Sequence, residues 1–278
     1  MEPEYAKGIL HPQEQARHRE LDRLPAGPVT GRFVEWYWAV RWDLRGRPSY
    51  TAEVLPHPSV NVTFEQTSTR SGGWVTGVCT RKYTRELAGE GWTFGVKFWP
   101  GGFGAFTGLD VGSFRDRAVP LREVFEDADR LTDLVMSTRD DVRRRAVVEG
   151  FLLDRQVGTY PSYEQVLRIV SAMVNDRELT RVDQVTERFG VPVRTLQRLF
   201  RRYVGAGPKW VLRRYRLHDA ADLLAHGRTE ELAGLAVELG YFDQAHFSRE
   251  FANEVGMPPL QYAAACAAAG SHVPVYAR

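Results

Sequence analysis

Basic side chains concentrate in one stretch of this 278-residue chain, between Arg194 and Arg216. The stretch contains eight arginines and lysines and no aspartate or glutamate, although acids are plentiful on both sides of it. Guanidinium and ammonium groups bind phosphate, and a guanidinium can donate two hydrogen bonds to one planar acceptor. Because like charges repel one another unless an anion neutralises them, the stretch favours a polyanion-binding face over a merely solvated basic surface.

Other reactive side chains form no recognisable catalytic or metal-binding pattern. The seven histidines are scattered, at positions 11, 18, 57, 218, 226, 246 and 272. No HxH or HExxH motif brings two of them together, the two cysteines are far apart, and no GxSxG sequence supplies a serine nucleophile. The glycine-rich PGGFGAFTG lacks the ending of a phosphate-binding loop and predicts turns. We therefore expect no catalytic residue, no metal site and no cofactor.

A short element occurs twice in the second half of the chain. GVPVRTLQRLF, residues 190–200, has nearly the same skeleton as GYFDQAHFSREF, residues 240–251. Four positions have counterparts of similar type fifty residues later: Val182, Val185, Phe189 and Gly190 correspond to Leu232, Leu235, Leu239 and Gly240. Six more have counterparts fifty-one residues later: Leu196, Arg198, Phe200, Val204, Gly205 and Pro208 correspond to Phe247, Arg249, Phe251, Val255, Gly256 and Pro259. The shift by one residue falls between two helical patterns, where a loop tolerates an additional residue.

Each copy has the periodicity of two short helices separated by a glycine turn. Apolar residues recur every three or four positions, and Gly190 and Gly240 suit the left-handed conformation that ends a helix. Thr180 and Asp183 predict a capping box at the start of the first copy. PKWVLRRYRLHDAADLLA, which begins at Pro208, predicts one longer helix that joins the copies.

Helix, glycine turn and helix within about twenty residues make a helix-turn-helix unit, whose second helix has the width of the DNA major groove. Two such units joined by one helix, with GYFDQAHFSREF followed by GMPPLQY in the second, resemble the DNA-binding domain of the AraC/XylS family of bacterial transcription regulators. The resemblance covers roughly the last 110 residues. It implies that the second helix of each unit, the recognition helix, enters one of two successive major-groove segments on one face of double-stranded DNA.

The resemblance also implies which side chains face the DNA bases. These positions are Arg194, Gln197 and Arg198 in the first unit and Gln244, Ala245 and Arg249 in the second. The residue types suit the role, because arginine can donate two hydrogen bonds to O6 and N7 of guanine and glutamine can pair with N6 and N7 of adenine. The residues expected to face inward are Leu196, Leu199, Phe200, Phe247 and Phe251.

Five further basic residues are expected to contact DNA phosphates or simply to keep the surface soluble: Arg201, Arg202, Lys209, Arg213 and Arg214. Phosphate contacts set affinity and salt dependence without carrying sequence information. Asp243 is predicted to cap the second recognition helix, where it and Glu250 add negative charge. We therefore expect the first unit to anchor the protein on DNA and the second to refine the choice of site.

The first half of the chain has a different period. RFVEWYWAVRW, SVNVTFE, GWVTGV and TFGVKFW alternate apolar and polar residues, are rich in β-formers and are separated by glycine, proline and serine. Short strands at such spacing predict a small antiparallel barrel or sandwich, which can enclose a pocket for a small organic ligand. We assign Trp36, Trp38, His57 and Trp99 to this effector pocket. The alternative is that the tryptophans, six of which lie within residues 30–110, only fill the core.

The predicted fold class is α+β with two domains: an N-terminal antiparallel β barrel or sandwich and a C-terminal all-α domain with two helix-turn-helix units. VPLREVFEDADRLTDLVMS and RDDVRRRAVVEGFLLDRQ predict two linking helices, which pack within the monomer or pair with a second copy. The break at VGTYPS marks the boundary. The predicted bounds are 1–118 for the β-rich sensor domain, 119–160 for the linking helices, 161–268 for the DNA-binding domain and 269–278 for a C-terminal tail.

These features predict a sequence-specific DNA-binding transcription regulator that responds to a small-molecule effector in its β domain. A β-barrel small-molecule-binding protein or enzyme with an accessory helical domain is the alternative, but it explains neither the repeat nor the acid-free stretch. Besides double-stranded DNA and the effector, RNA polymerase and a second copy forming a homodimer are candidate partners. No apolar run is long enough to span a membrane and no signal peptide is recognisable, so a cytoplasmic location is expected.

Overall fold

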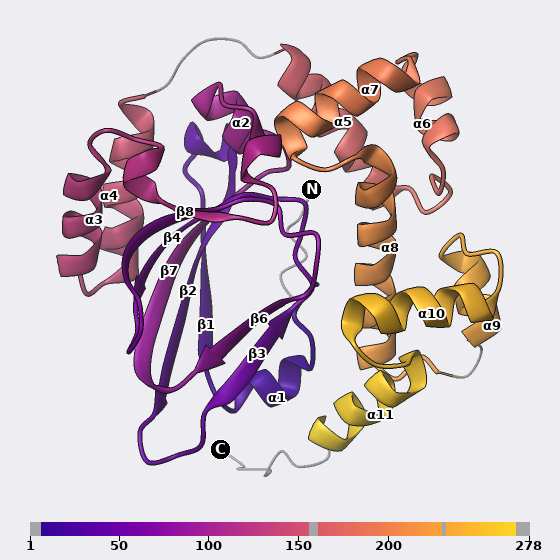
Figure 1. Cartoon of the computed structure of the whole chain (residues 1–278), viewed down its shortest axis with the longest axis horizontal. Helices are drawn as coiled ribbons and strands as arrows, with labels where there is room; N and C mark the ends of the chain where they lie inside the picture. Colours follow the sequence, from indigo (N-terminus) through magenta and orange to yellow (C-terminus); the bar gives the residue numbers. More distant parts are fainter. Residues whose placement is uncertain (1–6, 156–160, 230–231, 271–278) are drawn as a thin grey trace.

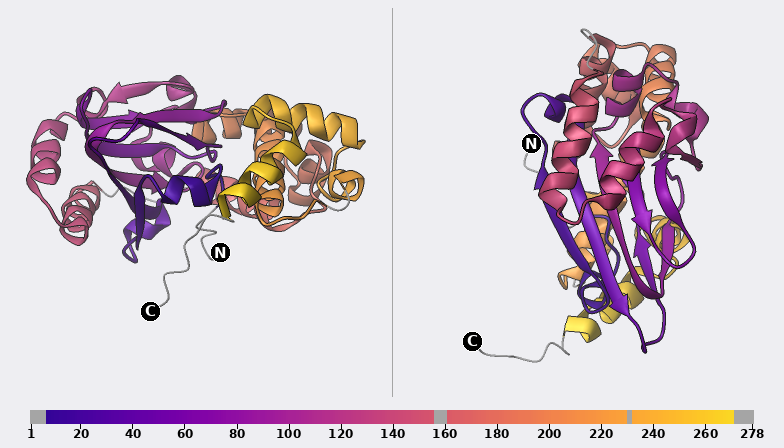
Figure 2. Two further views of the ribbon diagram at one scale, coloured as in Figure 1. Left: turned by 90° about the horizontal axis from the view of Figure 1, so that it is seen from below. Right: turned by 90° about the vertical axis from the view of Figure 1, so that its left-hand side faces the viewer.

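The computed structural model describes residues 7–155, 161–229 and 232–270. Two parts of different composition lie side by side (Figures 1 and 2). We call the described residues up to 155 the strand domain and those from 161 onward the helical domain. None of the described helices has the length and apolar character needed to cross a membrane.

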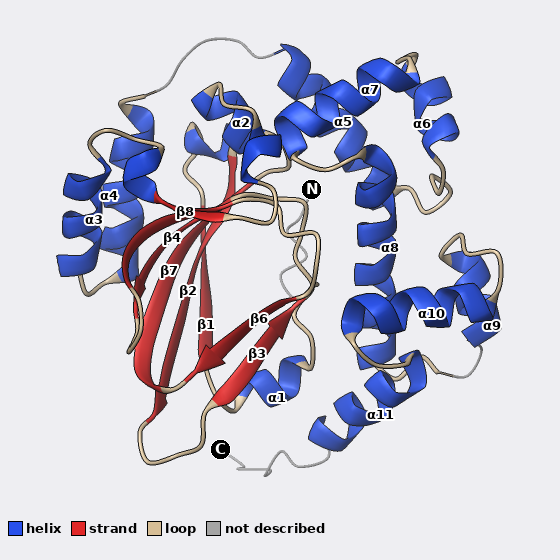
Figure 3. Ribbon diagram, in the orientation of Figure 1, coloured by secondary structure: helices blue, strands red, loops and turns tan. Residues whose placement is uncertain are grey.

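The strand domain contains two antiparallel sheets (Figure 3). Its strands are β1 (Glu20–Pro25), β2 (Val34–Leu44), β3 (Tyr50–Val54), β4 (Asn61–Gln66), β5 (Ser71–Thr76), β6 (Tyr83–Leu87), β7 (Gly89–Phe98) and β8 (Ala118–Pro120). The six-stranded sheet has the order β1-β2-β7-β4-β5-β8, and β3 pairs with β6 in the second sheet. The antiparallel two-sheet architecture confirms the sequence prediction in its sandwich form. Within the described residues the barrel is not closed, because β1 and β8 are the edge strands of the six-stranded sheet.

The helices predicted to link the domains pack on one face of the six-stranded sheet. They are α3 (Ala128–Ser137) and α4 (Asp141–Leu153). Their residues Leu131, Val135 and Val148 are buried in one apolar cluster with Phe64 and Phe94 of the sheet. Figure 1 shows both helices on the side of the sheet away from the helical domain. The sheet therefore covers one face of each helix, whereas Leu134 of α3 and Val142 and Leu153 of α4 are exposed.

The remaining short elements of the strand domain are α1 (Pro12–Ala16), α2 (Gly102–Thr107) and the 3-10 turns η1 (Thr30–Arg32), η2 (Val111–Phe114) and η3 (Leu121–Glu123). PGGFGAFTG forms α2, so the prediction of turns was wrong. Its glycines allow close packing: a Cβ on Gly102 would lie 2.4 Å from the carbonyl oxygen of Phe33, and one on Gly104 would lie 2.8 Å from Cγ2 of Val111. The glycines of α2 allow this helix to pack close to its neighbours. The sequence did not predict a helix here because glycine has a low helix propensity.

The described part of the helical domain consists of α5 (Pro161–Asn175), α6 (Val182–Phe189), α7 (Val193–Leu199), the π-helical turn η4 (Phe200–Val204) that continues α7, α8 (Pro208–Ala225), α9 (Leu232–Glu238), α10 (Gln244–Val255) and α11 (Pro259–Gly270). The pairs α6–α7 and α9–α10 are the two predicted helix-turn-helix units, and α8 joins them (Figure 1).

The sequence repeat is a structural repeat. Gly190 and Gly240 both adopt the left-handed conformation between the two helices of their units, with φ of 61° and 78°. The matched pairs Leu196/Phe247 and Phe200/Phe251 are fully buried. The residues immediately before the recognition helices are Pro192 and Asp243. Phe242 is therefore the additional residue of the second turn, and its side chain is exposed.

The start of α6 differs from the predicted capping box. The side chain of Gln184, not of Asp183, accepts hydrogen bonds from the backbone N–H groups of Thr180 (3.0 Å) and Arg181 (2.9 Å). Asp183 instead accepts a bond from Nε of Arg181. The helix begins at Val182, so Gln184 occupies its third position, from which a side chain reaches back to the cap.

Candidate nucleic-acid interface

All six residues predicted to face DNA bases are exposed on the recognition helices. They are Arg194, Gln197 and Arg198 on α7 and Gln244, Ala245 and Arg249 on α10. Among the residues predicted to face inward, Leu196, Phe200, Phe247 and Phe251 are buried and Leu199 is half-buried. Each recognition helix thus has an apolar face that attaches it to the domain and a polar face directed outward, as an amphipathic surface helix requires.

The joining helix sets the spacing of the two units. α8 has 18 residues, and at 1.5 Å per residue it is about 27 Å long. The two units follow one another along it (Figure 1). Successive major-groove segments on one face of B-DNA are about 34 Å apart, so the length of α8 suits two recognition helices in adjacent segments.

The second recognition helix is capped as predicted. Oδ1 of Asp243 accepts a 2.6 Å hydrogen bond from the backbone N–H of His246. Replacing Asp243 by alanine is expected to lower the free energy of unfolding by about 0.5–2 kcal/mol, because that N–H loses its partner. Urea denaturation followed by circular dichroism measures the loss. Asp243→Asn is the control and should retain most of the stability, whereas an unchanged Asp243→Ala variant would show that the cap contributes nothing.

Three of the five predicted phosphate-contacting residues are exposed near the first unit. They are Arg201 and Arg202 on η4 and Lys209 in the first turn of α8. Nη2 of Arg202 also lies 3.5 Å from the carbonyl oxygen of Gly108 in the strand domain. Because these three side chains are exposed when the two domains are packed as in this structure, an anionic partner can reach them.

Arg213 binds an acid from the second unit. Its Nε donates a 2.7 Å hydrogen bond to Oε1 of Glu250, and this contact raises the pKa of Arg213. Glu250 is buried and also accepts a 3.3 Å hydrogen bond from the hydroxyl of Tyr241. Glu250 therefore does not present free negative charge on the second recognition helix, contrary to the expectation from sequence. Of Asp243 and Glu250, the two acids expected to add negative charge to this helix, only Asp243 is exposed.

The prediction that Arg214 contacts phosphate is corrected by its position. Its side chain is 1% exposed. Nη2 donates to the carbonyl oxygen of Thr80 in the strand domain (2.7 Å) and to Oε2 of Glu254 (2.8 Å). Burial lowers the pKa of Arg214, and the neighbouring carboxylate partly offsets this effect. Arg214 thus connects the second unit to the strand domain, a role that its place in a basic stretch does not indicate.

Further residues that sequence reasoning did not identify hold both units against the strand domain. Nζ of Lys82 donates to the carbonyl oxygen of Val255 at the end of α10 (2.9 Å) and to Oε1 of Glu53 (2.6 Å). A lysine at this end of a helix also interacts favourably with the helix dipole. At the first unit, η4 packs on α2 and η2, where a Cβ on Gly205 would lie 2.9 Å from Cγ1 of Val111.

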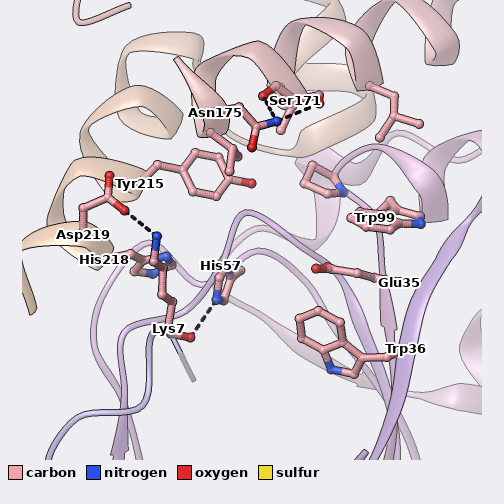
Figure 4. Close-up of a pocket in the computed structure, with 14 residues that line it drawn as sticks. Lys7, Glu35, Trp36, His57, Trp99, Ser171, Asn175, Tyr215, His218 and Asp219 are labelled. Carbon is pink, nitrogen blue, oxygen red and sulfur yellow. Dashed lines mark hydrogen bonds and ion pairs between the residues drawn. The ribbon is translucent and has the colours of Figure 1, made fainter. Parts of the chain in front are cut away.

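Two adjoining cavities contain the predicted effector residues. The first, of about 120 Å³, lies between the domains and is shown in Figure 4. Trp36, His57 and Trp99 line it from the strand domain, and α8 contributes Tyr215 and His218. The second, of about 250 Å³, lies between the two sheets and is lined by Trp36, Trp38 and His57. All four predicted residues therefore line one or other of two cavities, and Trp36 and His57 line both.

Two histidines meet at the boundary between the domains. The rings of His57 and His218 are 4.2 Å apart, and their Nε2 atoms lie 2.9 Å from the carbonyl oxygens of Lys7 and Leu55, respectively. Burial holds the pKa of both rings well below the usual value, and nearby positive charge lowers it further. Both effects favour the neutral form of the two rings. Within the described residues, no three histidine, cysteine or acidic side chains are grouped to hold a metal ion.

Comparison with known proteins agrees with this geometry. Residues 185–265 match the family described as "Helix-turn-helix domain", and residues 23–120 match a "Domain of unknown function (DUF6597)". An uncharacterised HTH-type transcriptional regulator of Haemophilus influenzae is 27% identical over 132 residues, which are 46% of this chain and 41% of that protein. The transcriptional activator RhaS of Escherichia fergusonii is 34% identical over 79 residues, 28% of each chain. The chain thus matches less than half the length of either relative.

Among solved structures, ToxT from Vibrio cholerae aligns with a TM-score of 0.41 and 11% sequence identity, covering 89% of this chain and 97% of that chain. The family match over residues 185–265 falls in the helical domain, whose two units, glycine turns and joining helix have been described above. By these sequence matches and by this geometry, residues 185–265 are a helix-turn-helix domain of the type found in AraC/XylS regulators.

Proposed function

We propose that the chain is a sequence-specific transcription regulator that binds double-stranded DNA through α7 and α10 and performs no catalytic step. The observation that carries the proposal is the equivalence of the two recognition helices: each exposes three predicted base-facing residues while the matched apolar residues are buried. Arginine and glutamine side chains on such helices can bond the edges of guanine and adenine. Relatives of the chain carry the names of transcriptional regulators.

Recovery of DNA bound to the tagged protein in cells tests this proposal. The expected result is enrichment of segments that share two short conserved blocks with centres about one helical turn of DNA, roughly ten base pairs, apart. A gel shift with an enriched segment and a scrambled one of equal composition then measures specificity. Equal affinity for the two segments would contradict sequence-specific regulation.

The exposed basic residues near the first unit are proposed to bind phosphates. Replacing Lys209 by alanine is expected to weaken DNA binding similarly for all sequences and to reduce the slope of log affinity against log salt concentration by about one. Binding titrations between low and moderate salt measure this slope. Arg130→Ala is the matched control, because Arg130 is exposed on α3, on the far side of the sheet. Identical slopes for Lys209→Ala and the control would exclude the phosphate contact.

We further propose that a small molecule in the strand domain controls how the two units are presented. Trp36 and His57 line the cavity between the sheets and also the cavity bounded by α8, which carries both units. A ligand that displaces either side chain therefore changes the packing against α8. RNA polymerase and a second copy of the chain are proposed as further partners in the regulated state, on the analogy of the regulator family.

A thermal-shift screen of the full chain against small metabolites tests the effector proposal. The expected result is a compound that raises the melting temperature and also changes the affinity for the enriched DNA segment. Compounds that bind the protein but leave its DNA affinity unchanged would argue against an effector role, while leaving the DNA-binding proposal intact.

A further inference from the structure

One face of the six-stranded sheet is lined by indole and charged side chains, although the opposite face belongs to an ordinary apolar core. Strand alternation places Trp36, Trp38 and Trp42 of β2 on the first face, which we call the inner face, and Tyr37 and Ala39 in the core. β3 and β6 close the other side of the cavity of about 250 Å³. A cavity with aromatic walls and a few polar groups is typical of a site for a small organic ligand.

Glycines on β7 make room for the indole rings of this face. A Cβ on Gly95 would lie 2.1 Å from the ring of Trp38, and one on Gly91 would lie 2.3 Å from the ring of Trp42. Both rings therefore lie against the backbone of β7. Indoles that lie along the sheet form the wall of the cavity rather than its filling.

The charged groups of the cavity are mostly positive. Its described lining contains one acid, Glu65, and the basic residues Lys7, Arg19, Arg23, Arg85 and Lys97. Ion pairs join Lys7 to Asp219 (2.7 Å), Arg85 to Glu65 (2.7 Å) and Lys97 to Glu35 (3.0 Å). Each of these three cations is balanced by its carboxylate, so the excess positive charge of the lining lies at Arg19 and Arg23, and Glu35 also acts electrostatically on Arg23.

Arg19 has a neutral partner. Its Nε and Nη2 both donate to Oε1 of Gln15, at 2.9 and 2.7 Å, and no acid among the described residues pairs with it. Arg23 stands opposite Trp38 in the pairing of β1 with β2, and its guanidinium lies 5.7 Å from the ring centroid of Trp36. Burial and the charge of Arg23 both lower the pKa of Arg19. A bound anion would relieve the repulsion that Arg19 receives from Arg23, whose own charge is partly balanced by Glu35.

We infer that the cavity between the sheets binds a small organic anion, with its carboxylate at Arg19 and Arg23 and its aromatic or aliphatic body against Trp36 and Trp38. A guanidinium matches a planar carboxylate in both geometry and charge. The indole rings offer broad apolar surfaces to the body of the ligand. A cationic ligand would add to the repulsion, and a neutral ligand would leave it in place. The inference rests on the proposed effector role of the strand domain and assigns a ligand class to it.

Titrations of the full chain with matched probes test this inference. The probes are phenylacetate, 1-naphthoate and octanoate, each beside its primary amide, and quenching of tryptophan fluorescence reports binding. At least one carboxylate is expected to bind ten or more times as tightly as its amide. Arg19→Gln should weaken binding of that carboxylate about tenfold or more and leave the amide unchanged, because only the charged ligand uses the guanidinium. Arg47→Gln, at an exposed position outside the cavity, should behave as wild type.

The inference is overturned if no carboxylate binds, if amides bind as tightly as carboxylates, or if Arg19→Gln leaves carboxylate affinity unchanged. A gel shift on the same preparations measures DNA affinity. It checks that the Arg19→Gln variant is folded, and it distinguishes failure of the ligand class from failure of the effector role. A carboxylate that binds through Arg19 without changing DNA affinity supports the ligand class and removes the effector role. An amide that binds as tightly as its carboxylate and changes DNA affinity supports the effector role and removes the ligand class.

Discussion

Replacing Arg194 and Arg249 together by alanine is expected to abolish discrimination between the bound DNA segment and a scrambled one. Each side chain is exposed on a recognition helix, one on α7 and the other on α10. A good bidentate contact between arginine and guanine contributes about 1–3 kcal/mol of discrimination. The double variant should therefore lose roughly 30-fold or more in specific affinity. Gel shifts at fixed salt concentration measure it, with the nonspecific affinity determined in parallel.

Arg130→Ala is again the control for this experiment, because Arg130 lies on α3, on the far side of the sheet. A double variant that retains full discrimination would refute the base contacts. Single variants rank the two units: Arg198→Ala should weaken binding more than Arg249→Ala does. The exposed cations Arg201, Arg202 and Lys209 all lie close to the first unit in the chain, and no acid is exposed on its recognition helix. The opposite order would mean that the second unit anchors the complex.

Replacing Phe247 by alanine is expected to destabilise the helical domain by about 3–5 kcal/mol, the usual range for a buried phenylalanine. Its side chain is 0% exposed and contacts the rings of Tyr241 and Phe251, with centroids 5.2 and 5.7 Å away. Removing the ring leaves a cavity between α10 and the rest of the second unit. The midpoint of urea denaturation and the specific DNA affinity should both fall.

Phe242 provides a matched control five residues away. It is the additional residue of the turn, and its side chain is 91% exposed. Phe242→Ala removes the same ring but creates no cavity, so its unfolding midpoint should stay close to that of the wild type. Equal losses for the two variants would mean that the second unit is not anchored by the face that carries Phe247.

Local patterns in the sequence were sufficient for the parts of the fold that depend on neighbouring residues. The period of the apolar residues and the two glycine turns predicted both helix-turn-helix units, because a helix exposes one face and buries the other wherever it packs. The strongly alternating strands β2, β4, β5 and β7 were predicted for the same reason. β1, β3 and β6 were not, because charged residues interrupt the apolar alternation of these strands.

The partners of charged side chains could not be predicted in this way. Arg213, Arg214 and Arg216 belong to a stretch without acids. Arg216 pairs with Asp219 three residues along its own helix, but the fold brings Glu250 and Glu254 to Arg213 and Arg214. Two of these acids come from α10, about forty residues along the chain, and no local pattern encodes such an approach. The pairing reduces the free positive charge of the stretch, and what remains exposed lies mainly on and beside the first recognition helix.

The sequence by itself determined that two equivalent recognition helices exist and which of their side chains face outward, because helical periodicity is a property of neighbouring residues. Only the tertiary structure decided that Arg214 and Lys82 attach the second unit to the strand domain, and that Trp36 and His57 lie between a charged cavity and α8. These contacts join residues far apart in the chain, and their positions depend on how sheets and helices pack as whole bodies.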